Sequence, residues 1–272
     1  MKQHVRTLIK LAVAFSATTA SVSEARTVTM ELTNLTHGMY FTPRLAAAHG
    51  SDFSIFQVGA TASPGLRTMA ETGSPMVLAG EVPGDAVFAV DASGDSPTIQ
   101  EGVPRILSPG STAMIVLEDV PDTNVLLSLG AMLMPTNDAI VGMDSFSLPD
   151  GTGSYEMFLN AYDVGTEANT ELVLPEPLRS IPECSSNEDE SNASCNNNSY
   201  VPFHPDASQS GFFGVGSDGS GVVSASSAET NVVHIHAGII GDFTNTGGAS
   251  DLNSSFHRWL NPVGRIRITV AE

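Results

Sequence analysis

Apolar residues at every second position mark the two ends of the sequence beyond residue 25. The alternating residues are Val28, Met30, Leu32, Ile266, Ile268 and Val270. Successive side chains of a β-strand point to opposite faces of a sheet, so this period places the apolar residues on one face. Both segments are therefore predicted to be half-buried strands of an antiparallel sheet.

Three internal segments are also predicted to be strands. Residues 113–117 and 125–134 are apolar runs, which we expect to be more deeply buried, and residues 231–236 (NVVHIH) form a shorter candidate. The chain contains 25 glycines and 16 prolines, which supply turns between such strands.

One short helix is predicted after Ser63, which can cap it, because Pro64 occupies the favoured first position and Gly73 can end it. Many strands with one short helix predict an all-β fold, an antiparallel β-sandwich. A region rich in Pro, Ser and Asn, at about residues 176–205, is predicted to be a long polar insertion within a single domain of residues 26–272.

The first 25 residues have the pattern of a signal peptide. Lys2, Arg6 and Lys10 precede a small apolar stretch at residues 11–20, and cleavage is expected after Ala25, with Ala20 as the alternative. Ten apolar residues are too few to span a bilayer, and no later stretch approaches the roughly 18 that a spanning helix needs. We therefore expect an exported protein, secreted or periplasmic, without a membrane span.

The charge balance restricts the partners. Acidic residues outnumber basic ones 30 to 11, for a net charge of -19. Nucleic acid binding needs the opposite sign, so it is excluded, whereas many carboxylates suit a hard cation such as Ca²⁺. The two cysteines, Cys184 and Cys195, lie in the polar insertion, and export predicts a disulfide bond between them.

Two acidic loops form the most specific candidate site. Residues 135–144 follow a predicted buried strand, and residues 161–169 come about twenty positions later. Loops separated by two antiparallel strands can open at the same end of a sandwich, where Asp138, Asp163 and Glu167 could supply oxygen ligands to Ca²⁺. The alternative is that these acids are solvated turn residues.

A second candidate uses His234 and His236, which lie on one face of a predicted strand. With a third ligand, such as His49, His204 or His257, they could hold Zn²⁺ or Cu²⁺ in a transition-metal protein or hydrolase. The alternative is a polar strand face under a loop. The sequence contains no phosphate loop, dinucleotide motif, serine-hydrolase elbow or catalytic cysteine motif, so a non-enzymatic protein is expected.

Ordered blocks along nearly the whole chain beyond residue 25 resemble the spondin N-terminal domain family, which occurs in animal matrix proteins of the F-spondin and mindin type and in bacterial exported proteins. These blocks lie at residues 32–36 (LTNLT), 41–43, 48–49, 56–59, 63–66, 128–133 (SLGAML), 136–138 (TND), 141–142, 162–171 (YDVGTEANTE), 234–239 (HIHAGI) and 259–263 (WLNPV).

The resemblance implies a C2-like β-sandwich with a Ca²⁺ site in loops at one end and a role in cell adhesion or matrix contact. Carried over by motif, the metal ligands are Asp138, Asp163 and Glu167, with help from the carbonyl of Tyr162. Animal members tend to have aspartate where Glu167 stands. The implied partner is an extracellular or envelope protein or glycan of unknown identity. The remaining alternative is a metal-free domain that packs in a larger envelope assembly.

Overall fold

The computed structural model describes residues 25–95, 106–149, 151–169, 171, 231–243, 249–250 and 252–272. This part of the chain is built mainly of antiparallel strands, with two short helices. The elements are β1 (Arg26–Asn34), β2 (Tyr40–Phe41), β3 (Arg44–His49), α1 (Pro64–Thr72), α2 (Met76–Ala79), β4 (Val87–Asp91), β5 (Thr112–Val120), β6 (Leu126–Met134), β7 (Ala139–Ser147), β8 (Gly153–Asp163), β9 (His234–Ile235) and β10 (Gly264–Ala271).

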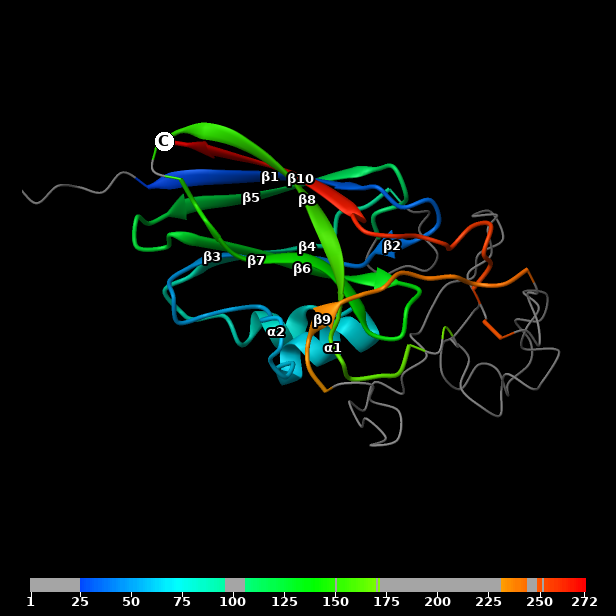
Figure 1. Cartoon of the computed structure of the whole chain (residues 1–272). Coiled ribbons are helices and arrows are strands. Elements are labelled where there is room, and N and C mark those ends of the chain that lie inside the picture. The colour runs from blue at the N-terminus through cyan, green and yellow to red at the C-terminus, as the bar shows by residue number, and fades with distance from the viewer. Residues whose placement is uncertain are drawn as a thin grey trace, which may run out of the picture.

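The strands form two layers that face each other (Figure 1). The order is β4-β3-β6-β7-β8-β10-β1-β5, with β2 added at β6 and β9 at β8. The end strands β4 and β5 also contact each other, so the sheet is nearly closed. The predicted all-β antiparallel sandwich is confirmed.

Strand β8 belongs to both layers. Its residues 153–159 pair with β10, whereas residues 160–163 pair with β7. The chain therefore passes from one layer to the other within a single strand. Because β7 and β8 are antiparallel neighbours, the loop before β7 and the loop after β8 lie at the same end of the molecule.

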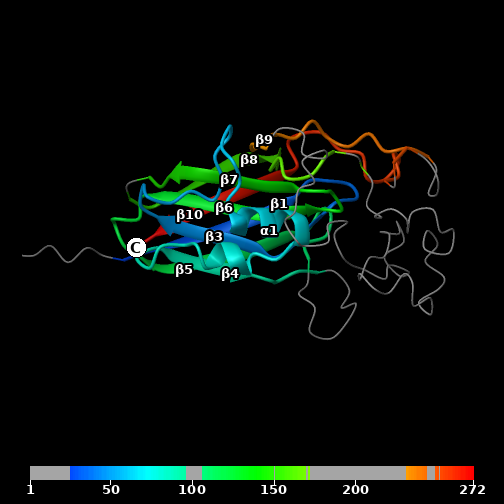
Figure 2. The ribbon, with the colours of Figure 1, turned by 90° about the horizontal axis from the view of Figure 1, so that it is seen from below.

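Two hydrophobic clusters lie on either side of the layer that contains β6 and β7. The larger one fills the space between the layers and includes Met30, Leu129 and Ile266. The smaller one lies under the helices and includes Leu66 and Ile140. Figure 2 shows α1 lying across the outer side of this layer, which explains why β6 is buried on both faces.

The predicted helix is confirmed at both ends as α1. The Ser63 side chain accepts a hydrogen bond from the Leu66 amide at 3.0 Å, and Pro64 is the first helical residue. Gly73 ends the helix with φ of 73°, a left-handed conformation that glycine adopts without steric cost. The second helix, α2, was not predicted, because its four residues are too few to show a helical period.

The strand predictions are confirmed for β1, β6 and β10, and corrected at two places. Strand β5 is not deeply buried. Met114 is 59% and Val116 41% exposed, because one face of the layer that contains β5 and β1 meets solvent. The strand expected at residues 231–236 is reduced to the two residues of β9.

Several predictions fall outside the described residues. These are the signal peptide apart from Ala25, the insertion at residues 176–205, His204, and the Cys184–Cys195 disulfide. Within the described ranges, no helix is long and apolar enough to cross a bilayer.

The side chain of Asn261 bridges the point where β10 separates from β8. Its Oδ1 accepts a hydrogen bond from the Ala161 amide at 2.7 Å, and its Nδ2 donates to the His236 carbonyl at 3.1 Å. The side chain thus satisfies backbone groups that the departing strand leaves behind.

Replacing Asn261 by alanine should lower the free energy of unfolding by about 1–3 kcal/mol, since buried backbone groups would lose their partners. Chemical denaturation measures the change. Leu260→Ala is the control, because Leu260 is 67% exposed, and it should change the stability by less than about 0.5 kcal/mol. Equal effects of the two substitutions would contradict this role of the Asn261 side chain.

Candidate metal site

Two buried aspartates meet where β7 begins and β8 ends. Ala139 is paired with Asp163 across the two strands, and Asp138 directly precedes Ala139. Both carboxylates are completely buried, with 0% exposure. The structure therefore brings together two of the three carboxylates that the sequence predicts as metal ligands.

One oxygen of Asp138 is held by the loop after β8. Its Oδ2 accepts hydrogen bonds from the Thr166 amide at 2.7 Å, the Thr166 hydroxyl at 3.2 Å and the Glu167 amide at 2.9 Å. These donors come from the second predicted acidic loop. The loop is thus folded back over the first aspartate.

The other oxygen of Asp138, Oδ1, is buried and has no hydrogen-bond partner among the described residues. Burial and the nearby carboxylate of Asp163 raise the pKa of Asp138 to about 7. A buried acceptor without a donor, next to a second carboxylate, is unfavourable unless a proton or a cation supplies positive charge.

Asp163 is held by its own loop and by β9. Its Oδ1 accepts from the Gly165 amide at 2.6 Å, and its Oδ2 accepts from the side-chain amide of Asn169. The Nε2 atom of His234 lies 3.7 Å from Oδ2, because β9 pairs with the end of β8. Segments far apart in sequence therefore converge on this carboxylate.

Local hydrogen bonds fix the turn that presents Asp138. The Thr136 hydroxyl donates to the Leu133 carbonyl at 2.6 Å and accepts from the Ala139 amide at 3.1 Å. A threonine in such a turn replaces backbone partners that the departing strand no longer provides.

The two other predicted ligands lie nearby but in different settings. The backbone amide of Glu167 donates a hydrogen bond to Asp138, and Glu167 is half-buried. The Tyr162 ring packs against Phe56 with centroids 4.6 Å apart, and burial raises the pKa of its hydroxyl. Within the described ranges, no group of three or more His, Cys, Asp or Glu side chains could hold a metal ion.

The aspartate pair therefore fits a cation that takes further ligands from backbone carbonyls or water. Ca²⁺ is such a cation, since it accepts six to eight oxygens of mixed origin in flexible geometry. Zn²⁺ would need at least three His, Cys, Asp or Glu ligands, and the described residues contain no such group.

The histidines do not assemble around a common point. His236 packs against Trp259 with ring centroids 5.0 Å apart, and its Nδ1 accepts from the Gly238 amide at 3.0 Å. His49 is buried beside Ser128, with Nε2 2.8 Å from the hydroxyl. His234 instead lies beside Asp163, as described above.

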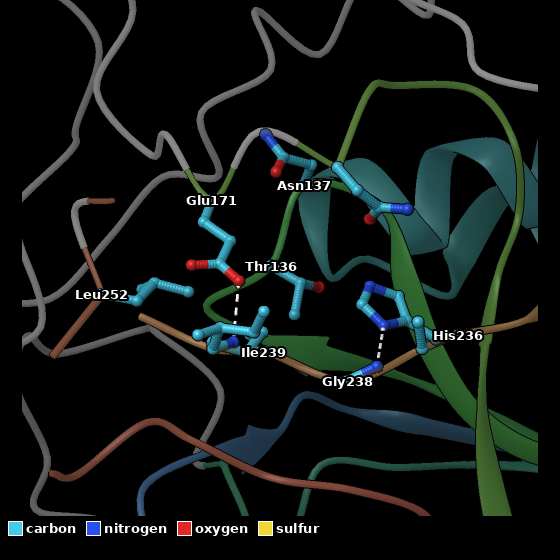
Figure 3. Close-up of a pocket in the computed structure, with 10 residues that line it drawn as sticks. Thr136, Asn137, Glu171, His236, Gly238, Ile239 and Leu252 are labelled. Atoms are coloured by element: carbon cyan, nitrogen blue, oxygen red, sulfur yellow. Dashed lines mark hydrogen bonds between the residues drawn. The ribbon is translucent and has the colours of Figure 1, made fainter. Parts of the chain in front are cut away.

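A cavity of about 210 Å³ adjoins the aspartate pair. Thr136 and Asn137, which precede Asp138, line one side, and Asn169, the partner of Asp163, also lines it. Figure 3 shows Glu171, His236, Ile239 and Leu252 around the same space. The sequence pattern did not indicate this cavity, because its walls come from four separate segments.

Comparison with known proteins agrees with this architecture. The sequence model of Spondin_N, the spondin N-terminal domain, matches residues 33–210, more than half of the chain. The chain belongs to the spondin N-terminal domain family. Human Spondin-2 is 33% identical over 129 residues, which cover 46% of this chain and 37% of that protein. Rat Spondin-2 is 30% identical over 129 residues, with the same two coverages. The match thus spans little more than a third of these relatives.

The raised pKa of Asp138 predicts a specific pH dependence in the presence of a chelator. The ordinary pKa of Asp138 is 3.8, and its pKa in the folded protein is about 7. Between these two pH values, Asp138 keeps its proton in the folded protein, whereas the unfolded chain has lost it. The free energy of unfolding should therefore fall as the pH rises through this window.

Asp138→Asn should remove that dependence and raise the stability at pH 8 by on the order of 2 kcal/mol, because the amide carries no charge. Asp85→Asn is the control, since Asp85 is exposed. Urea melts at a series of pH values measure both. An unchanged slope in Asp138→Asn would contradict the assignment of the proton to Asp138.

Proposed function

We propose that this protein is an exported, non-enzymatic Ca²⁺-binding β-sandwich that mediates adhesion at a cell surface or in a matrix. The observation that carries the metal proposal is the buried Oδ1 of Asp138, which has no hydrogen-bond partner among the described residues and lies beside the carboxylate of Asp163. A divalent cation supplies the positive charge that this pair requires at neutral pH.

The proposed ligands are the carboxylates of Asp138 and Asp163, joined by the carboxylate of Glu167 and the carbonyl of Tyr162. When bound, Ca²⁺ neutralises the two buried aspartates. The backbone amides of Thr166 and Glu167 orient Asp138, and Asn169 orients Asp163. These contacts tie the loop after β8 to the turn before β7.

Family membership supports the adhesion role. The chain matches the spondin N-terminal domain and is similar to human and rat Spondin-2, and the resemblance to this family implies a role in cell adhesion or matrix contact. The basic and apolar start of the sequence supports export, to the periplasm or beyond the cell. The proposed partner is an extracellular or envelope protein or glycan.

Ca²⁺ should raise the melting temperature at pH 8. Binding to the folded state alone contributes about 2.7 kcal/mol at a hundredfold excess over the dissociation constant. The shift should shrink below about pH 7, because the proton on Asp138 competes with the metal. Differential scanning calorimetry with Ca²⁺ and with chelator measures both effects.

Asp163→Asn should abolish the Ca²⁺ shift, whereas Asp85→Asn, at an exposed position in another segment, should retain it. Glu167→Gln should weaken the shift if the Glu167 carboxylate is a ligand. Equal melting temperatures with and without millimolar Ca²⁺ at pH 8 would refute metal binding.

A further inference from the structure

The cavity next to the aspartate pair has the lining of a small polar ligand site. The described side chains that line it include two amides (Asn137 and Asn169), a hydroxyl (Thr136), an imidazole (His236) and aliphatic residues such as Ile239. Amides both donate and accept hydrogen bonds. A ligand with hydroxyl groups on one edge and C–H groups on the other matches both kinds of wall.

The charged group in the lining is already engaged. The Glu171 carboxylate accepts hydrogen bonds from the Ile240 amide at 2.8 Å and the Gly241 amide at 2.9 Å (Figure 3 shows this side chain). It therefore holds the wall formed by residues 238–241 in place. The cavity does not require a cationic ligand to balance a bare charge.

An anionic ligand is disfavoured by the same residues. Among the described residues that line the cavity there is no lysine or arginine, and Glu171 adds a negative charge. The two buried aspartates next to the cavity add no net positive charge, even when one Ca²⁺ neutralises them. The ligand best suited to this potential is uncharged.

The size of the cavity limits the ligand to one ring. Sites for drug-sized molecules have volumes of about 300–1,000 Å³, and this cavity has about 210 Å³. The orientation of the imidazole is fixed, because His236 packs on Trp259 and its Nδ1 accepts from Gly238. Because Nδ1 is the acceptor, the ring carries a proton on Nε2.

We propose that this cavity binds a single neutral sugar residue, the terminal unit of a glycan. The inference rests on the proposed function in one respect, which is that Ca²⁺ orders the walls. Asn169 both lines the cavity and donates to Asp163, and Asn137 lines it and precedes Asp138. Sugar binding should therefore depend on Ca²⁺, and the glycan is the proposed adhesion partner.

The test uses the full chain without its expected signal peptide, and the methyl glycosides of mannose, glucose, galactose and N-acetylglucosamine. Ligand-observed NMR at pH 8, with Ca²⁺ and with chelator, measures saturable binding. At least one glycoside should bind with a dissociation constant of about 1 mM, and chelator should weaken binding roughly tenfold. The methyl glycoside of glucuronic acid should bind more weakly than that of glucose, because of its charge.

Ala237→Trp tests the location. Ala237 is exposed and lines the cavity, so the larger side chain should obstruct it and weaken binding by roughly tenfold or more. Ala271→Trp is the matched control, because Ala271 is exposed at the end of β10 and does not line the cavity. The Ca²⁺ shift in melting temperature should be unchanged in both variants.

The outcomes separate the two proposals. Failure of all four neutral glycosides to bind, with the Ca²⁺ melting shift intact, overturns the sugar site and leaves the metal site standing. Binding that survives Ala237→Trp overturns the location. Sugar binding that is unaffected by chelator overturns the coupling to the metal, and loss of the Ca²⁺ melting shift itself refutes the proposed function independently.

Discussion

Strand β8 pairs with β10 in one layer and with β7 in the other, and this pairing positions both the hydrophobic core and the aspartate pair. The first part of the strand is bonded to β10 and the last part to β7, so one continuous backbone joins the two layers. The larger hydrophobic cluster can form only because the layers face each other across this strand. The crossing leaves backbone groups unpaired, and Asn261 replaces the missing neighbour. The end of β8 then carries Asp163 to the start of β7.

At that end, two carboxyl groups are buried next to each other, where water cannot screen their charges. The backbone around Asp138 is arranged for an anion, since two amides and a hydroxyl point at one carboxylate oxygen. The second oxygen has no donor within the part of the chain that the structure describes. A site purely for structural stability would more simply use an uncharged residue here, so the retained charge is the physical reason to look for a bound cation.

The features that were predicted correctly are those encoded in neighbouring residues. Alternation identified β1 and β10, and the Ser63, Pro64 and Gly73 signals located α1 at both ends. The exposure of Met114 and Val116 was missed, because an apolar run does not reveal whether a second layer covers its outer face.

The site was predictable only in part, for a similar reason. The spacing of the acidic loops and the resemblance indicated Asp138 and Asp163 together, and strand register brings them close to each other. The donors from Thr166 and Asn169, the approach of His234 and the adjacent cavity depend on how distant segments meet. No local pattern encodes that convergence.

The contact between β4 and β5 protects the edges of the sheet from association with other protein chains. Strand edges with unpaired backbone groups are templates on which other chains can add a strand and aggregate. Here the two strands that terminate the order lie against each other. A foreign strand that approached either of them would have to displace its neighbour first. Near-closure of the sheet thus hinders fibre-like association.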